Sequence, residues 1–362
     1  MENQNPQAPS NGREAALLLA WYDENARDLP WRVPPGANTA PDPYGVWLSE
    51  VMLQQTTVAA VREYYQKFLG LWPDVTSLAE AADEDVMAAW AGLGYYSRAR
   101  NMLKAARFVA FERNGVFPDS EAGLLALPGV GPYTAAAIAA IAFGERAVVV
   151  DGNVERVMAR YFAIDTPLPA AKPELRAAMD HLTPALRCGD FAQAVMDLGA
   201  TVCKPRTPDC LACPWAEGCA ARSAGTADTL PRKAPKKAKP ERRAHALVVS
   251  DGRDIHLERR PAKGLLGGTM GVPLSEMVEF AAGETPPDLP VPWKTSETLR
   301  YCGEITHVFT HFRLTVKVWR SDTDKAHPLT HSMETALASV PTLMKKIIRK
   351  AQEAEDMPKL PL

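Results

Sequence analysis

The sequence lacks an excess of charge of either sign. It has 41 lysine and arginine residues against 43 aspartate and glutamate residues, which gives a formal net charge of −2. Such a chain does not attract a polyanion through its overall field, so any nucleic-acid partner must be held by local basic patches. The composition, with 46 % hydrophobic and 23 % charged residues, is that of an ordinary soluble globular protein.

The sequence also lacks a long hydrophobic run. Its N-terminus, MENQNPQAPSNGR, is polar and has no apolar core of the kind found in signal peptides. The longest run of small apolar residues, 134–143, is too short to span a bilayer and ends at Gly144-Glu145-Arg146. We therefore expect no membrane association, a cytoplasmic location (at the nucleoid if the source is bacterial), reduced cysteines and, by default, a monomer.

The length predicts two domains, because 362 residues are more than one hydrophobic core usually serves. The composition changes sharply at residues 223–243, where the stretch PRKAPKKAKPERR holds seven basic residues, one acidic residue and three prolines. This stretch is typical of a linker, either simply solvated or lying along DNA. The predicted organisation is a disordered tail at residues 1–12, a mainly α-helical domain at 13–222, the linker at 223–243, and an α/β domain at 244–362.

A glycine-containing turn, LPGVG at residues 127–131, precedes a small-residue helix at 135–142. Glycines such as Gly129 and Gly131 allow tight turning and close approach, and the N–H groups at a helix start attract an anion. A turn of this kind between two helices can bind a nucleic-acid phosphate without reading bases. It can equally be an ordinary joint between helices.

Two carboxylates lie in unusual places. Asp151 follows three valines at the start of a helix, where it is either a plain N-cap or a catalytic carboxylate whose charged form the helix favours. Trp47, Glu50, Val51 and Gln54 fall at i, i+3, i+4 and i+7 of a helix expected within residues 43–70. A carboxylate on this apolar face is either solvated at its edge or buried and protonated as a general acid.

Four of the six cysteines lie within 17 residues in a C-x6-C-x2-C-x5-C pattern: Cys203, Cys210, Cys213 and Cys219. Four thiols so close in a cytosolic chain indicate a metal site rather than disulfides. Zinc and a [4Fe–4S] cluster both accept four thiolates, and the spacing alone does not choose between them. Cys188 and Cys302 stand apart and are expected to be inert core thiols.

Together these motifs resemble the helix-hairpin-helix DNA glycosylase superfamily, in which a phosphate-binding hairpin precedes a catalytic Asp. The run SEVMLQQT at residues 49–56 resembles the signature of its adenine glycosylase (MutY) branch. The cysteine pattern resembles the iron–sulfur loop of endonuclease III-like and adenine glycosylases. The resemblance covers residues from about 13 to 350 and implies a helix-hairpin-helix glycosylase domain with a [4Fe–4S] cluster on the loop at 203–219.

The resemblance implies catalytic roles. Glu50 would protonate adenine as the general acid, and Asp151 would stabilise the oxocarbenium-like sugar or form a transient covalent adduct. Tyr133 stands at the seventh position of LPGVGxK, where glycosylases that also cut the backbone carry a lysine, so little or no strand cleavage is expected. Tyr133 and Asn153 are expected in the catalytic pocket, with packing and helix capping as the alternatives.

The resemblance also implies residues that contact DNA. Gly129 and Gly131 would belong to the phosphate-binding hairpin. Tyr95, the first tyrosine of GLGYY at residues 92–96, would wedge into the duplex, and Gln55 would insert near the vacated position. A packed turn is the simpler interpretation of the GLGYY segment.

Beyond the linker the hydrophobic period becomes two. The alternation predicts a β-hairpin at residues 246–257 and a half-buried strand at 312–318, and an amphipathic helix is expected after Pro341. This part resembles the Nudix-like C-terminal domain of adenine glycosylases. It lacks the glutamate-rich helix of Nudix pyrophosphatases, so we expect a recognition domain without hydrolase activity.

The segment at residues 307–312 resembles the family's loop that senses 8-oxoguanine. Phe309-Thr310-His311 stands where that loop usually reads Phe-Ser-His. Threonine keeps the hydroxyl but adds a methyl group and restricts χ1. Thr310 and His311 are therefore predicted to contact the lesion, with an altered geometry at Thr310.

The predicted function is a monofunctional DNA glycosylase that excises adenine mispaired with 8-oxoguanine or guanine in duplex DNA and so initiates base excision repair. One alternative is an endonuclease III-like glycosylase and lyase acting on oxidised pyrimidines, against which Tyr133, Glu50 and the second domain argue. The other is a non-enzymatic DNA-binding or redox-sensing iron–sulfur protein, against which the pairing of Glu50 with Asp151 argues.

Overall fold

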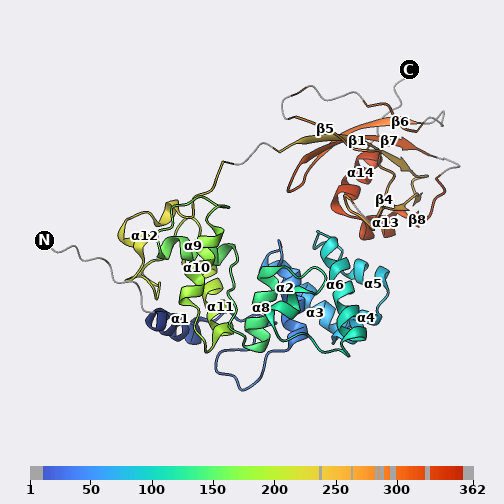
Figure 1. Ribbon diagram of the computed structural model, residues 1–362. Coiled ribbons are helices and arrows are strands. Elements are labelled where there is room, and N and C mark those ends of the chain that lie inside the picture. Colours follow the sequence, from blue (N-terminus) through green and yellow to red (C-terminus); the bar gives the residue numbers. More distant parts are fainter. Residues whose placement is uncertain are drawn as a thin grey trace. The chain divides into compact units, whose positions relative to one another are not determined.

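The computed structural model describes residues 11–235, 239–261, 264–281, 284, 289–293, 299–322 and 327–353 (Figure 1). The expected disordered tail at residues 1–12 lies outside these ranges, apart from Asn11 and Gly12, which begin the first helix, α1 (Asn11–Asn25). Residues 236–238 of the expected linker also lie outside them. No helix within the described ranges combines the length and the hydrophobicity that a bilayer crossing requires.

The chain divides into two compact units. The first unit holds Met1–Asp83 and Arg100–Pro235, and the second holds Glu84–Ala99 and Lys236–Leu362. Each unit is described by itself below. The domain boundaries expected from the sequence stay predictions.

The described part of the first unit is helical. After α1 its helices are α2 (Pro43–Leu53), α3 (Val58–Leu71), α4 (Val75–Glu80), α6 (Ser97–Arg107, continued by the π-helical turn Phe108–Glu112), α7 (Glu121–Leu125), α8 (Pro132–Phe143), α9 (Gly152–Tyr161), α10 (Lys172–Leu182), α11 (Cys188–Asp197, continued by the π-helical turn Leu198–Val202) and α12 (Ala220–Ser223). The short helix α5 (Asp83–Ala89) and the first residues of α6 fall within the second unit. Mainly helical structure at residues 13–222 is therefore confirmed.

The helix expected within residues 43–70 is in fact two helices. The α2 helix begins after Asp42, whose side chain accepts hydrogen bonds from the N–H groups of Tyr44 and Gly45. It ends at Leu53, and α3 starts after Thr57, whose hydroxyl accepts from the Ala60 N–H. The expectation of one helix was wrong because the apolar periodicity continues across the break, whereas the turn between the helices depends on backbone dihedrals that periodicity does not show.

The hairpin predicted from LPGVG joins α7 to α8. Gly129 has φ of 79°, in the left-handed region, and a Cβ atom there would lie 2.6 Å from the Asn101 Cβ on α6. Both the backbone conformation and the close approach therefore require glycine at this position. Gly131 differs, since it is the N-cap of α8 with φ of −93° and a Cβ there would meet no atom within 4 Å.

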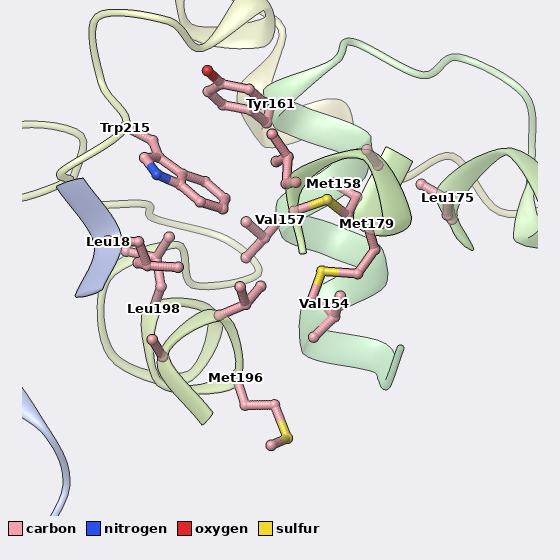
Figure 2. Close-up of a cluster of buried hydrophobic side chains, with 14 of the residues drawn as sticks. Leu18, Val154, Val157, Met158, Tyr161, Leu175, Met179, Met196, Leu198 and Trp215 are labelled. Carbon is pink, nitrogen blue, oxygen red and sulfur yellow. The ribbon is translucent and has the colours of Figure 1, made fainter. Parts of the chain in front are cut away.

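One hydrophobic cluster joins α1, α9, α10 and α11 and fixes the start of α9 (Figure 2). Trp215, from the cysteine-containing loop, packs into it with 3 % exposure and donates its indole N–H to the Glu14 carbonyl at 2.8 Å. Figure 2 shows Trp215 beside the α9 residues of the cluster. A loop with four partly exposed cysteines is thus anchored to the core by a single large aromatic side chain.

The second unit contains a four-stranded sheet in the order β5-β1-β7-β6. Its long strands are β1 (Glu241–Val249), β6 (Arg300–Val308) and β7 (Arg313–Ser321), and β1 pairs with β7 in parallel. The short strands are β2 (Asp254–Ile255), β3 (Glu258–Arg259), β4 (Met270–Gly271), β5 (Val278–Phe280) and β8 (His331–Ser332). Helix α13 is Met333–Ser339, and α14 (Thr342–Glu353) packs on β1, β6 and β7.

The predicted strand at residues 312–318 and the helix after Pro341 are confirmed by β7 and α14. The predicted hairpin at residues 246–257 is confirmed at its turn but not along its length. Ser250 and Ile255 form an antiparallel bridge, and the N–H groups of His256 and Asp251 donate to the carbonyls of Val249 and Asp254. Away from the turn, β1 pairs with β5 and β7, and β2 pairs with β8. Alternating apolar residues show that a segment is a strand but do not choose its partner.

Candidate active site

A pocket of about 480 Å³ opens in the first unit. Its walls come from the loop after α1 and from α2, α8, the start of α9, and α11. It brings together the predicted catalytic residues and one predicted DNA contact: Glu50, Gln55, Tyr133, Asp151 and Asn153. Its volume lies within the range that small-molecule sites occupy.

Glu50 lies at the inner end of the pocket, on the buried face of α2. It is only 5 % exposed, and its Oε2 has no hydrogen-bond partner among the described residues. Burial is the main reason why its pKa rises from 4.5 to about 7, and the negative charge of Asp151 adds to the rise. Tyr133 and Arg32 act in the opposite direction and lower it. At neutral pH Glu50 therefore holds a proton in a substantial fraction of molecules, as a general acid requires.

Asp151 is in a different environment, at the N-cap of α9. Its Oδ1 accepts from the N–H groups of Asn153 (2.9 Å) and Val154 (2.8 Å), and its Oδ2 accepts from the Asn153 side-chain amide at 2.9 Å. Three N–H donors and the helix N-terminus all stabilise negative charge on this carboxyl group. The pocket thus holds one carboxyl group suited to carry a proton and another surrounded by N–H donors.

Asn153 is itself held in place by a chain of contacts. Its side-chain oxygen accepts from Arg156 at 2.9 Å, and the same guanidinium donates to the carbonyls of Gly199 (2.7 Å) and Cys203 (2.8 Å). The orienting amide beside Asp151 is therefore tied to the beginning of the cysteine loop.

Tyr133 lies on the first turn of α8, between Glu50 and α11. Its hydroxyl donates to the Met196 Sδ at 3.6 Å and faces the Glu50 carboxyl group. Burial, followed by the charges of Glu50 and Asp151, raises the pKa of Tyr133 well above its usual value. The phenol therefore stays neutral and can act only as a hydrogen-bonding group.

Two arginines of the pocket wall were not foreseen from the sequence. Arg32 forms a bidentate pair with Asp197, at 2.7 and 2.9 Å, and Arg27 donates to the same carboxylate at 2.6 Å. Asp197 is fully buried, so its two partners compensate the cost of burying its charge. No local pattern links these residues, because Asp197 follows the two arginines by more than 160 positions. Gln193, also missed, lines the same pocket.

Gln55 and Tyr95, both predicted to enter DNA, share an uncommon backbone conformation. Gln55 has φ of 59° and Tyr95 has φ of 48°, although neither is glycine. A non-glycine residue in this region costs free energy, and such residues are concentrated at functional sites. Tyr95 is also 48 % exposed, in keeping with a side chain that is available to a ligand.

The four cysteines of the predicted cluster line one small cavity together with Arg160. No three His, Cys, Asp or Glu side chains in the described ranges converge as a ready site for a single metal ion. Four thiols around one cavity are a donor set that both zinc and an iron–sulfur cluster accept. Burial, and then the neighbouring thiols, raise the pKa of Cys213 to about 12, so a bound cationic group is needed to hold this sulfur as a thiolate.

Arg160 connects this cavity to α9. Its buried guanidinium donates to the Cys203 Sγ at 3.3 Å and to the carbonyls of Lys204 (2.7 Å), Pro205 (2.9 Å) and Leu230 (3.1 Å). A positive charge beside a cysteine sulfur is the arrangement expected where thiolates are present.

Comparison with known proteins identifies the chain. Residues 48–183 match the model of the HhH-GPD superfamily base excision DNA repair proteins, and residues 244–350 match the NUDIX domain. The chain is 36 % identical over 409 residues to the adenine DNA glycosylase of Homo sapiens, covering 92 % of this chain and 73 % of that protein. The chain belongs to the adenine DNA glycosylase family.

Other relatives support the same family assignment. The adenine DNA glycosylase of Mycobacterium tuberculosis is 39 % identical over 236 residues, covering 65 % of this chain and 73 % of the relative. Among solved structures, a thermostable thymine-DNA glycosylase superposes with a TM-score of 0.53 at 30 % identity, over 59 % of this chain and 97 % of that one. The adenine DNA glycosylase family and the helix-hairpin-helix fold expected from the sequence are therefore confirmed.

In this adenine glycosylase, the segment expected to sense 8-oxoguanine is the turn between β6 and β7. The Phe309 N–H donates to the Phe312 carbonyl at 2.9 Å, which closes the turn around Thr310 and His311. Within the second unit, the hydroxyl oxygens of Tyr95 and Thr310 lie 2.7 Å apart. Two residues predicted independently to contact DNA are thus neighbours.

Proposed function

We propose that this adenine glycosylase is monofunctional and removes adenine paired with 8-oxoguanine or guanine in duplex DNA. The observation that carries the proposal is the pair of carboxyl groups in one pocket, a buried Glu50 with its pKa raised to about 7 and an Asp151 held by N–H donors. Glycosyl transfer uses two carboxyl groups in just these two protonation states.

The proposed reaction begins when the adenine is flipped out of the duplex into the pocket. Glu50 donates its proton to the adenine ring, which makes the base a better leaving group. The N-glycosidic bond then breaks, the bonding electrons leave with the protonated base, and the sugar becomes oxocarbenium-like. Ionised Asp151 stabilises this cation or forms a transient covalent adduct, and water attack, aided by Glu50, completes the hydrolysis.

The absence of strand cleavage follows, in this proposal, from Tyr133. A lysine in that position would attack the sugar to form a Schiff base, whereas a neutral phenol with a raised pKa is a poor nucleophile. Tyr133 instead positions the Glu50 carboxyl group, and Asn153 orients Asp151 through the hydrogen bond from its side-chain amide.

DNA contacts are proposed for both units. Gly129 and Gly131 would bring the α8 N-terminus to a phosphate. Gln55 and Tyr95 would enter the duplex beside the flipped base. Thr310 and His311 would contact 8-oxoguanine, and the NUDIX-type domain would serve recognition without hydrolysing nucleotides.

The proposed cofactor is a [4Fe–4S] cluster held by Cys203, Cys210, Cys213 and Cys219. Bound there, it would cross-link a short loop that Trp215 and the hydrogen bonds from Arg160 also hold, and it would supply no acid or nucleophile to the base. Lys204, Arg206 and Arg222, which lie next to the cysteines in the sequence, would then contact DNA from a fixed loop. We further propose that the protein works as a monomer in the cytoplasm, or at the nucleoid if bacterial.

A single-turnover assay on three labelled duplexes tests the function. The duplexes carry adenine opposite 8-oxoguanine, adenine opposite thymine, and thymine glycol opposite adenine, and each is read with and without hot alkali. Breaks that require alkali and occur only at the mispaired adenine are expected. Breaks without alkali, or at thymine glycol, would indicate a glycosylase and lyase, and no product on any duplex would support a binding protein.

A further inference from the structure

The Tyr133 hydroxyl faces two possible acceptors in the pocket. One is the Met196 Sδ, to which it donates at 3.6 Å, and the other is the Glu50 carboxyl group. Met196 comes from the C-terminal end of α11, is 8 % exposed, and belongs to the buried cluster of Figure 2, where it lies at the edge. Its sulfur is therefore held beside the phenol by packing.

A phenol has a single proton to donate, so the direction of its hydrogen bonds depends on Glu50. When Glu50 is ionised, the Tyr133 hydroxyl donates to the carboxylate, which is much the stronger acceptor. When Glu50 is protonated, the carboxylic acid can donate to the Tyr133 oxygen, and the phenol proton then needs another acceptor. The Met196 sulfur, 3.6 Å from the hydroxyl oxygen, provides that acceptor.

We propose that Met196 is a positioning residue which, by accepting the Tyr133 hydrogen bond, favours the protonated form of Glu50. The inference rests on the proposed role of Glu50 as the general acid. In this arrangement Met196 acts on Tyr133, and Tyr133 acts on Glu50, so three side chains set the protonation of the acid. In the structure the Tyr133 oxygen lies 3.6 Å from the Met196 Sδ, within reach of the hydrogen bond that is required when Glu50 holds the proton.

Other charged groups also act on Glu50, and they must stay unchanged in any test. Asp151 favours the protonated form, whereas Arg32 favours the ionised form. Arg32 and Arg27 are held by Asp197, the residue next to Met196 on α11. A substitution at Met196 must therefore leave the Asp197 ion pairs in place, which makes apolar residues of similar volume the suitable choice.

The experiment compares Met196→Leu and Met196→Ile with the parent, each alone and combined with Tyr133→Phe. The Glu50 carboxyl group of the free, full-length protein is titrated by carbon-13 NMR, with Glu50→Gln to assign its resonance. Both substitutions remove the acceptor and are expected to lower the Glu50 pKa by about half a unit, the size that a weak neutral hydrogen bond gives. In the Tyr133→Phe background, the same substitutions are expected to leave the pKa unchanged.

Three outcomes are informative. An unchanged Glu50 pKa in both Met196 variants would overturn the inference. An equal decrease with and without the Tyr133 hydroxyl would overturn it too, because the effect would then come from packing. If the pKa falls as expected but the pH dependence of single-turnover excision does not move with it, the inference stands and the assignment of Glu50 as the acid fails.

Discussion

At the scale of single residues, Glu50 and Asp151 are the same functional group in opposite environments. Glu50 is buried, and one of its carboxyl oxygens has no partner among the residues that the structure describes, whereas Asp151 accepts three N–H hydrogen bonds at a helix start. Desolvation acts against charge at the first site, and aligned donors favour it at the second. The two carboxyl groups of one pocket therefore lie in environments that treat negative charge in opposite ways.

Replacing Glu50 by Gln should abolish most turnover while leaving DNA affinity intact. The amide fills the same space but cannot give a proton, and loss of a general acid usually slows a reaction by about 10²- to 10⁴-fold. Single-turnover excision and DNA titration measure the two properties. Glu63→Gln, on the exposed surface of α3, is the matched control and should behave as the parent. If Glu50→Gln excised adenine at the parent rate, the assignment of Glu50 as the general acid would be wrong.

Glu50 should also make stability depend on pH. Because its pKa is raised from 4.5 to about 7, its favourable contribution is complete below pH 4.5 and is lost as the pH rises through 7. The Glu50→Gln variant lacks this loss. The quantity to compare is the free energy of unfolding of the variant minus that of the parent. This difference should be larger at pH 8 than at pH 4 by up to about 3 kcal/mol, since one pKa unit corresponds to about 1.4 kcal/mol. Urea unfolding at both pH values measures the difference, and parallel profiles would contradict it.

Thr310 permits a residue-scale test of lesion recognition. Thr310→Ala removes the hydroxyl in the β6–β7 turn and should reduce the preference for adenine opposite 8-oxoguanine over adenine opposite guanine. Thr310→Ser keeps the hydroxyl and is expected to retain the preference. Ratios of single-turnover rate constants on the two duplexes measure it, and a ratio that the alanine variant leaves unaltered would exclude the turn from recognition.

At the scale of elements, the hairpin between α7 and α8 depends on one glycine more than on the other. Gly129 turns with a left-handed backbone against Asn101 on α6, while Gly131 caps α8 with an ordinary backbone and free space beside it. The sequence shows two equivalent glycines, and only the packing of α6 against the turn distinguishes them.

Gly129→Ala should therefore lower the free energy of unfolding by roughly 1–3 kcal/mol, from the positive φ and the contact with Asn101 together. Gly131→Ala is the matched control and should change it by less than about 1 kcal/mol. Chemical denaturation of both variants gives the comparison. Equal losses would mean that neither the backbone conformation nor the α6 contact sets the requirement for glycine.

At the scale of the whole molecule, the two units differ in how they are built. The first unit is built of helices, of which α1, α9, α10 and α11 share one buried cluster, and a mixed sheet covered by α14 forms most of the second. The cysteine loop has little core of its own, since Trp215 is its large buried side chain. A bound cluster would compensate for that deficit by cross-linking four points of the loop.

Anaerobic purification of the full chain should accordingly give a coloured protein with about four iron and four sulfide ions per chain. Removal of the iron should release the loop and lower thermal stability, as expected when binding and folding of a small metal site are coupled. Metal and sulfide analysis, followed by thermal unfolding with and without iron, tests both statements. A colourless protein that holds one zinc ion would contradict the proposed cofactor.

The sequence by itself determined the features that are written in local patterns. The hairpin glycines, the carboxylate before α9, the grouped cysteines, the strand at β7 and the amphipathic helix α14 all follow from spacing or periodicity over a few turns. The family also follows from such motifs. Patterns of this kind indicate the secondary structure or the local motif of a segment, because the backbone of that segment alone positions its side chains.

Only the tertiary structure decided which segments meet. It divided the expected helix at Gln55 and paired β1 with β7 rather than with the residues after Ser250. It also brought Arg27 and Arg32 to Asp197, and Met196 to Tyr133, across separations of 63 to 170 residues. These contacts depend on how whole helices pack, and the pKa of Glu50 depends in turn on the burial and charges that the packing creates.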